Sequence, residues 1–293
     1  MKTIRLVYPQ WQGGHFPENG FISKEWFPGI PVQDLAQGYM LGAQFLAMLA
    51  PPATCETFTV PISTEYDRKA ADGVMDRDII AQQTKAALDI LNIANADRIA
   101  VLGGECSVSA APFTWLAHKY QGDIAMVWID AHPDITLPGE AYDGYHAMAC
   151  TACLGMGDPA IIGQLPARIE PQKTLFVGLR DWERDDIKNR QKTLGIDHLT
   201  PEDLRTRPGA LKAWLDACPA RHILVHFDLD VLDPAEIIPA VGKVPDGMKT
   251  AEAVSTIQTI ATAKNLVGLT VAEPMPQVAL KLRRMLAQLP LLS

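Results

Sequence analysis

Short runs of apolar residues, rich in valine, isoleucine and leucine, recur along the chain without alternating with polar residues. Such runs are typical of strands that are buried on both faces of a parallel sheet. Between them, apolar residues recur at helical spacing. Strands that alternate with helices predict an α/β fold with a three-layer, doubly wound, mostly parallel sheet. The five expected strands are Arg98–Leu102, Ile124–Ile129, Thr174–Leu179, His222–Phe227 and Leu266–Val271.

The 293-residue chain has no internal repeat, no low-complexity tract and no linker rich in serine or glycine, so we expect a single domain over residues 1–293. Helices are expected around Ile80–Leu91, around Leu211–Leu215 and over Met248–Lys264. The segment Pro9–Pro31 is rich in glycine, proline and aromatic residues. We interpret it as an ordered surface loop, with the covering of a site edge as the alternative.

Charge and composition exclude some function classes. The formal net charge of −8 argues against nucleic-acid binding and does not favour an anionic membrane. The N-terminal apolar run is too short for a signal peptide, and no stretch is long enough to span a membrane, so a cytoplasmic location is expected. Five cysteines, an odd number, do not suggest a disulfide framework, and free thiols are expected.

Polar residues cluster where three of the expected strands end. The segments Gly103–Ser107, Asp130–Asp134 and Asp228–Pro234 each follow an apolar run. In open α/β sheets the ligand site lies at the carboxyl ends of the strands. In extended chain, residues i, i+2 and i+4 point the same way, so the acidic residues of each segment can converge.

Carboxylates packed in this way would repel one another without cations, and divalent metals would relieve that repulsion. A lone Asp-x-Asp at a strand end is more often a turn or a helix cap than a ligand. Two such clusters, Asp130–Asp134 and Asp228–Asp230, both at strand ends, favour a metal site.

The same segments resemble the signatures of the ureohydrolase family, which includes arginases, agmatinases and formiminoglutamases. Asp130–Asp134 is similar to the family's Asp-Ala-His-x-Asp, and His226–Pro234 to its Ser-Phe-Asp-x-Asp-x-x-Asp-Pro. Gly103–Ser107 is similar to Gly-Gly-Asp-His-Ser. The resemblance runs from about Arg98 to Pro276, and it implies the α/β fold that arginases share with deacetylases.

The resemblance implies a hydrolase that splits a C–N bond of a guanidino-type (amidine) substrate and releases urea. A hydroxide held between two divalent metals would attack the guanidine carbon. Asp130 and Asp228 would bridge both metals, His132 and Asp230 would complete one, and Asp134 and Cys106 the other. His146 would shuttle protons, and Glu273 would bind the guanidinium. The implied catalytic residues are Asp134, His146 and Glu273. Family members also suggest a homo-oligomer.

Cys106 departs from the family pattern, which usually has histidine there. One interpretation is a small buried hydrophobe, in which case the site holds one metal or none. The other is a thiolate ligand, which shifts the preference from manganese towards cobalt, nickel or zinc. The cysteine resembles the branch that hydrolyses Nω-hydroxy-arginine, which is also similar to this chain at Cys106–Ser109 and Val244–Met248.

We expect Cys106→His to tighten manganese binding and to move the pH–activity curve to lower pH. With a thiolate, the ligands bring five negative charges against the four positive charges of two divalent ions, which weakens the metal pair as a Lewis acid. Metal titration and a pH–rate profile check this prediction. An unchanged metal affinity and an unchanged profile would contradict it.

A second departure concerns the substrate's far end. Thr136 and Asp143 occupy the approximate positions of an arginase Asn and Ser that help to hold the substrate carboxylate. An aspartate facing a carboxylate would repel it, so Asp143 favours an amine-ended substrate over free arginine. The alternative is that Asp143-Gly144 is only a turn.

Two other functions compete with a hydrolase of this family. A metal-poor, non-catalytic homologue with a binding or regulatory role is kept open by Cys106. A deacetylase on the related fold would use one metal and would lack the second Asp-x-Asp arrangement, so Asp228 and Asp230 argue against it.

Overall fold

The structure is a computed structural model that describes residues 1–16, 32–275, 286 and 288–291. An eight-stranded sheet forms its centre, and each pair of neighbouring strands in it runs parallel. The strand order is β2-β1-β5-β10-β9-β6-β7-β8. The strands are β1 (Thr3–Tyr8), β2 (Glu56–Thr59), β5 (Arg98–Gly103), β6 (Ile124–Ile129), β7 (Thr174–Val177), β8 (Asp197–Leu199), β9 (His222–Asp228) and β10 (Asn265–Ala272). A separate antiparallel hairpin pairs β3 (Ala70–Ala71) with β4 (Val74–Met75).

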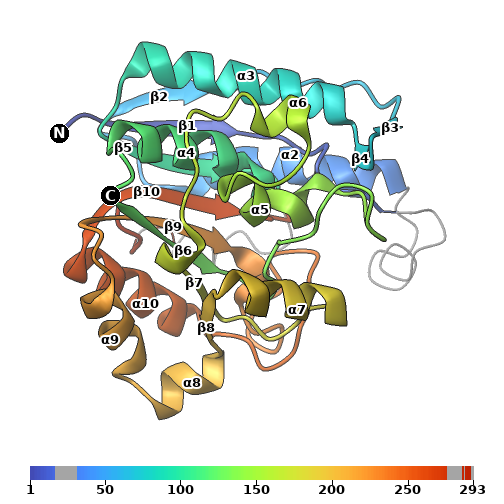
Figure 1. The fold of residues 1–293 in the computed structure, drawn as a ribbon. Helices are drawn as coiled ribbons and strands as arrows, with labels where there is room; N and C mark the ends of the chain where they lie inside the picture. Colours follow the sequence, from blue (N-terminus) through green and yellow to red (C-terminus); the bar gives the residue numbers. More distant parts are fainter. Residues whose placement is uncertain (17–31, 276–285, 287, 292–293) are drawn as a thin grey trace.

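Helices cover both faces of the sheet, which confirms the three-layer, doubly wound fold (Figure 1). On one face a core forms with α3 (Arg77–Ala94), α4 (Ala110–Lys119), α5 (Ala149–Cys153) and α6 (Pro159–Ile162). On the other, a core forms with α2 (Val32–Leu49), α9 (Ala210–Ala217) and α10 (Thr250–Ala263). Helices α7 (Asp185–Leu194) and α8 (Pro201–Thr206) follow β7 and β8 along the chain.

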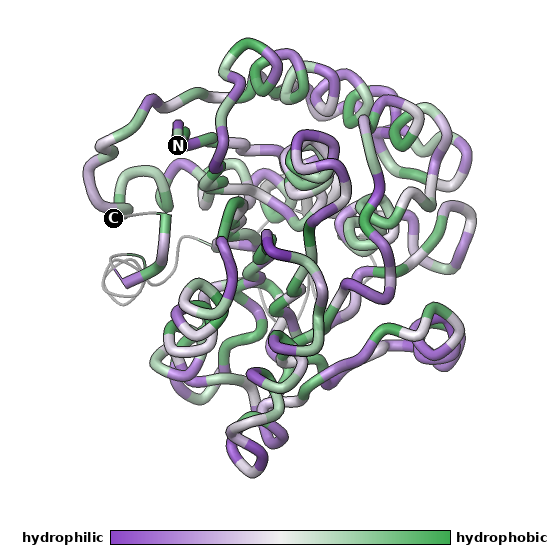
Figure 2. The backbone as a smooth tube through the Cα atoms, turned by 60° about the vertical axis from the view of Figure 1, so that its left-hand side comes forward, coloured by the Kyte–Doolittle hydropathy of each residue, from purple (hydrophilic) through white to green (hydrophobic). Residues whose placement is uncertain are grey.

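The apolar runs identified in the sequence are the five central and near-central strands. Their residues are almost all buried, whereas helices such as α3 and α9 bury only one face. In Figure 2, hydrophobic and hydrophilic residues alternate along α3, the helix at the top. The strands β1, β2 and β8 were not predicted. The apolar run of β1 is interrupted by Arg5, although the strand itself is continuous. β2 and β8 are short edge strands with exposed residues.

The predicted helices are α3, α9 and α10. The last of these begins at Thr250, two residues later than predicted, because Met248 forms an isolated parallel bridge with Leu232. Of the expected loop Pro9–Pro31, residues 17–31 lie outside the described residues. The described part contains no helix or strand, and His15 and Phe16 line the cavity discussed below. Across the described ranges, no helix is both long and apolar enough to cross a membrane.

Four neighbouring strands, β5, β10, β9 and β6, position the candidate site. Because they run parallel, their carboxyl ends lie at the same edge of the sheet. Gly42 of α2 lets this helix approach the chain that follows β10, since a Cβ there would lie 1.8 Å from the carbonyl oxygen of Pro274. This close contact fixes the segment next to Glu273.

Candidate metal centre

The segments after β6 and β9 bring an imidazole between two carboxylates. His132 Nδ1 lies 3.0 Å from Asp230 Oδ2 and 3.6 Å from Asp130 Oδ1. The indole Nε1 of Trp128 donates to Asp130 Oδ2 at 3.0 Å, and the amide of Ala131 donates to Asp230 Oδ1 at 3.3 Å. These contacts fix the carboxylates, and ligand atoms of Asp130, His132 and Asp230 lie close enough to hold one ion.

The loop after β5 brings a thiol to the same place. The short 3-10 helix η1 (Cys106–Ser109) begins here, and the Glu105 carboxylate caps it by accepting from the amide of Ser107 at 2.8 Å. Cys106 is buried, and its Sγ donates to Asp228 Oδ2 at 2.8 Å. Asp228 is thereby held between Cys106 and the amide of Asp230, which donates to Asp228 Oδ1 at 2.6 Å.

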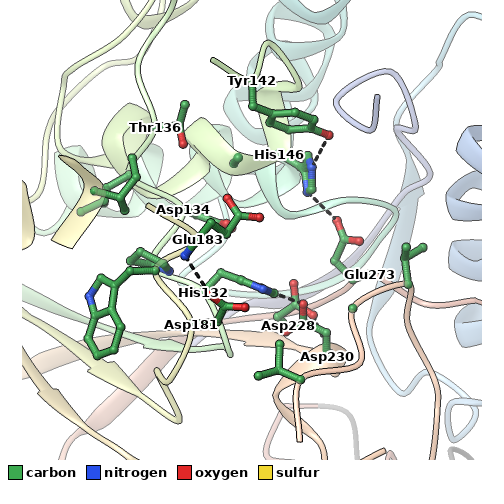
Figure 3. Close-up of a pocket in the computed structure, with 18 of the residues that line it drawn as sticks. His132, Asp134, Thr136, Tyr142, His146, Asp181, Glu183, Asp228, Asp230 and Glu273 are labelled. Atoms are coloured by element: carbon green, nitrogen blue, oxygen red, sulfur yellow. Dashed lines mark hydrogen bonds and ion pairs between the residues drawn. The ribbon is translucent and has the colours of Figure 1, made fainter. Parts of the chain in front are cut away.

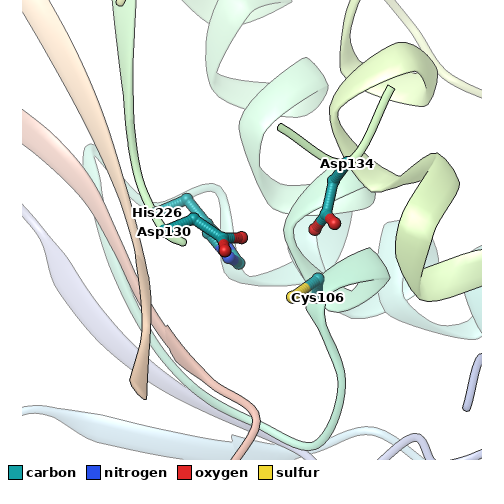
Figure 4. Close-up of side chains that lie close together, drawn as sticks. All are labelled: Cys106, Asp130, Asp134 and His226. Carbon is teal, nitrogen blue, oxygen red and sulfur yellow. The ribbon is translucent and has the colours of Figure 1, made fainter. Parts of the chain in front are cut away.

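A second group of ligand atoms lies across from the first. One ligand atom each from Cys106, Asp130, Asp134 and His226 lies within 4.8 Å of the others. Figure 4 shows these four side chains close together. Asp134 has a left-handed backbone, with φ of 50°, and its Oδ2 has no hydrogen-bond partner among the described residues. Strained backbone and an unpaired buried oxygen are features of binding sites.

The carboxylates destabilise one another as anions. Burial raises the pKa of Asp130 to about 7, and the charge of Asp230 adds to the shift. Burial, with the charges of neighbouring aspartates, also raises the pKa of Asp228 and of Asp134 well above the usual range. Burial would raise the pKa of Asp230 too, but the imidazole of His132 outweighs it and lowers that pKa to about 2. Cations would allow all four groups to ionise together.

The thiol of Cys106 is also destabilised as an anion. Burial raises the pKa of Cys106 well above its ordinary value, and the charges of Asp228 and Asp134 raise it further. A thiolate at this position therefore needs a cation beside it.

A hydrogen-bonded row of three side chains borders the carboxylates. His146 Nδ1 lies 3.4 Å from Glu273 Oε1, and the Tyr142 hydroxyl lies 2.8 Å from His146 Nε2 (Figure 3). Glu273 is buried and has a φ of 62°, a strained conformation for glutamate. Although burial opposes the shift, contact with Tyr142 and the Glu273 carboxylate raise the pKa of His146 well above its ordinary value.

These groups line a cavity of about 450 Å³, the size of a small-molecule site. Thr136 lines it, as do Tyr39 and Trp182. Asp143 is not among the lining residues, because its carboxylate turns to His15, where Oδ1 lies 2.5 Å from Nδ1.

Eight of the predicted residues lie together at the sheet edge, and Thr136 lies nearby on the cavity wall. The eight are Cys106, Asp130, His132, Asp134, His146, Asp228, Asp230 and Glu273.

Sequence reasoning missed several side chains of the site. Tyr39 and Tyr142 come from a helix and a loop with no motif, and His226 stands inside an apolar strand. The one available signal was His226 itself, because an imidazole two residues before Asp228 points to the same side of the strand. Cys150 and Cys153 are buried on α5, and all five cysteines are free.

Comparison with known proteins supports the geometry. The model of the arginase family matches residues 53–288. The chain is 26% identical over 241 residues to an arginase of Entamoeba histolytica, covering 78% of this chain and 76% of that protein. It is 30% identical over 179 residues to an N(omega)-hydroxy-L-arginine amidinohydrolase of Streptomyces lavendulae, covering 60% of this chain and 61% of that protein, which is less than two thirds of its length.

Solved structures show the same fold. The crystal structure of the Entamoeba histolytica arginase with L-ornithine superposes with a TM-score of 0.79 at 18% identity, covering 98% of this chain and 96% of that one. The family model extends over most of the sequence and includes every residue of the candidate centre. The chain therefore belongs to the arginase family.

Proposed function

We propose that this chain is a metal-dependent amidinohydrolase that cleaves a C–N bond of a guanidino-type substrate and releases urea. The observation that carries the proposal is the meeting of two ligand groups, which share Asp130, beside Glu273 and His146. Membership of the arginase family supports the reaction type. The non-catalytic alternative is not favoured, because the acidic cluster and the cavity next to it are both present.

The residues fit a pair of divalent cations. Burial and the neighbouring aspartates raise the pKa values of Asp130 and Asp228, and Oδ2 of Asp134 has no partner among the described residues. Nearby cations would stabilise these carboxylates as anions and would bind the unpaired oxygen. Asp130 belongs to both ligand groups, which supports a bridging role. Asp228 contacts Cys106 on one side and Asp230 on the other, which supports the same role for Asp228.

The remaining ligands divide between the two positions. His132 and Asp230 would complete one cation, and Cys106 and Asp134 the other. Carboxylate oxygens suit manganese, whereas the sulfur of Cys106 favours cobalt, nickel or zinc. We propose manganese as the physiological ion, with the later metals as alternatives that Cys106 allows.

The chain's own residues would supply substrate binding and proton transfer. When bound, the cations would lower the pKa of a water molecule, so that a nucleophile is present near neutral pH. The buried Glu273 carboxylate would pair with the guanidinium and hold its carbon towards the aspartates. His146 would give a proton to the leaving amine nitrogen, and the Tyr142 hydroxyl would keep the ring in place.

The cavity wall would set the preferred substrate. Thr136 offers a hydroxyl to the far end of the substrate. Asp143 would act through His15, whose ring it holds at the cavity edge, and would favour an amine-ended or otherwise cationic group over a carboxylate. We also propose that the chain forms a homo-oligomer, which sedimentation analysis would test.

We expect urea release from at least one guanidino compound, and we expect it to depend on metal and on His146. The protein would be loaded separately with manganese, cobalt, nickel and zinc. It would be tested on arginine, Nω-hydroxy-arginine, agmatine, guanidinobutyrate and guanidine, with formamide release followed for formiminoglutamate. His146→Asn should lower kcat by roughly 10²-fold or more, the scale of general acid–base catalysis.

The metal content of the same samples separates the possible failures. No activity and no bound metal would contradict the hydrolase. No activity with two metals bound would place the substrate outside the panel and contradict the proposed substrate class.

A further inference from the structure

His226 is a buried histidine that none of the roles above uses. It lies on β9 two residues before Asp228, so both side chains point to the same face of the sheet. Its ring is fully buried and stacks on Trp128, its neighbour on β6, with centroids 3.6 Å apart and an interplanar angle of 9°. The stack fixes the plane of the imidazole and therefore the direction of both nitrogens.

Only one of the two nitrogens has a hydrogen-bond partner among the described residues. Nδ1 lies 2.8 Å from the hydroxyl oxygen of Ser109, whereas Nε2 is buried without a partner. A neutral imidazole has one donor and one acceptor nitrogen. Whichever nitrogen carries the hydrogen, Nε2 is left without a hydrogen-bond partner in the described part of the chain. In the tautomer with the hydrogen on Nδ1, Nδ1 donates to Ser109 and Nε2 presents a lone pair, which is the form that a metal ligand requires.

The unpaired nitrogen belongs to the second ligand group. A ligand atom of His226 lies within 4.8 Å of ligand atoms of Cys106, Asp130 and Asp134. Ligands on opposite sides of one ion, each roughly 2.0–2.3 Å from it, span a similar distance. Figure 4 shows the ring of His226 beside Asp130, with Asp134 and Cys106 facing them. Asp134 Oδ2 is also without a partner among the described residues. A cation between Asp134 Oδ2 and His226 Nε2 would satisfy both atoms.

The geometry points to His226 Nε2 as a ligand of the cation that Cys106, Asp130 and Asp134 would hold. The inference rests on the proposed two-cation site and adds to it an imidazole from β9. The sequence is consistent with an exchange of ligand positions. Cys106 stands where the ureohydrolase signature has histidine, and His226 stands where it has serine. A sulfur, a nitrogen and two carboxylates would make this position softer than its neighbour and would favour cobalt or zinc there.

The experiment is a Co²⁺ titration of the metal-free full chain, with bound metal measured by elemental analysis and coordination followed by visible absorption. His226→Phe removes the nitrogen and keeps a flat ring on Trp128. The matched control is His222→Phe, which alters a histidine on the same strand that stacks on Tyr120 at the other end, with centroids 3.9 Å apart. His226→Asn serves as a second variant, with a smaller polar side chain.

We expect two Co²⁺ ions per chain in the wild type and in His222→Phe. In His226→Phe and His226→Asn one ion should bind as before, and the other should bind at least roughly tenfold more weakly with an altered spectrum, since even supporting partners of metal ligands contribute 10- to 100-fold. Melting of the metal-free proteins separates loss of folding from loss of metal.

Each other outcome has a distinct meaning. Two ions with wild-type affinity and spectrum in both His226 variants would overturn the inference and leave the proposed function intact. A wild-type chain that binds no cation would overturn both. One ion in the wild type, lost in both variants, would support His226 as a ligand and contradict the two-cation site.

Discussion

Asp228→Asn should lower kcat/KM for the preferred guanidino compound by about 10³-fold or more, since bound metal ions supply several kcal/mol of charge stabilisation and each ~1.4 kcal/mol changes the rate tenfold. The Asp228 carboxylate lies between Cys106 and Asp230 and would join both cation positions. An asparagine keeps the shape but loses the charge and one lone-pair oxygen. The variant should therefore also lose at least one of its two metals.

The matched control for this substitution is Asp233→Asn, in the same acidic segment. Asp233 Oδ1 accepts from the amide of Ala235 at 2.9 Å, outside the ligand groups, and Asp233 is partly exposed. We expect full metal content and unchanged kcat/KM in this variant. Retention of both metals and of activity in Asp228→Asn would contradict the bridging role of Asp228.

Glu273→Gln should lower kcat/KM by about 10²-fold while leaving two metals bound. Neutralising one partner of a buried, hydrogen-bonded charge pair costs roughly 2–5 kcal/mol, and each ~1.4 kcal/mol is a factor of ten. The loss should appear in KM as well as in kcat, because the carboxylate is proposed to hold the guanidinium during binding and reaction. Steady-state kinetics with elemental analysis of the same samples measure both effects.

The metal content of Glu273→Gln also tests the division of roles in the site. Glu273 Oε1 lies 3.7 Å from Cys106 Sγ, and Glu273 forms a possible ligand group with Cys106 and Asp228. A fall to one metal would assign Glu273 to a cation and contradict its role as substrate anchor. The control is Glu105→Gln, a buried carboxylate that accepts from Ser107 and does not line the cavity. It should lower the melting temperature without changing KM.

The candidate site could be predicted largely because its residues belong to the strand ends. The runs that became β5, β6, β9 and β10 are mostly apolar and almost entirely buried, which is typical of strands covered on both faces. Parallel strands place their carboxyl ends at one edge, so the acidic segments after them had to meet. The edge strands β2 and β8 could not be predicted, because they are short, partly exposed segments without a continuous apolar run.

The sequence by itself thus determined five inner strands of the sheet, three of its helices and the meeting of Asp130 with Asp228, because buried strands and their ends can be inferred from local apolar and acidic patterns. Only the tertiary structure decided which further side chains reach that place. Asp143 turns to His15, more than a hundred residues away, and His226 looks like any buried residue until strand register stacks it on Trp128 and η1 brings Ser109 to its ring. Such contacts join segments far apart in the chain, and no local pattern encodes the packing that brings them together.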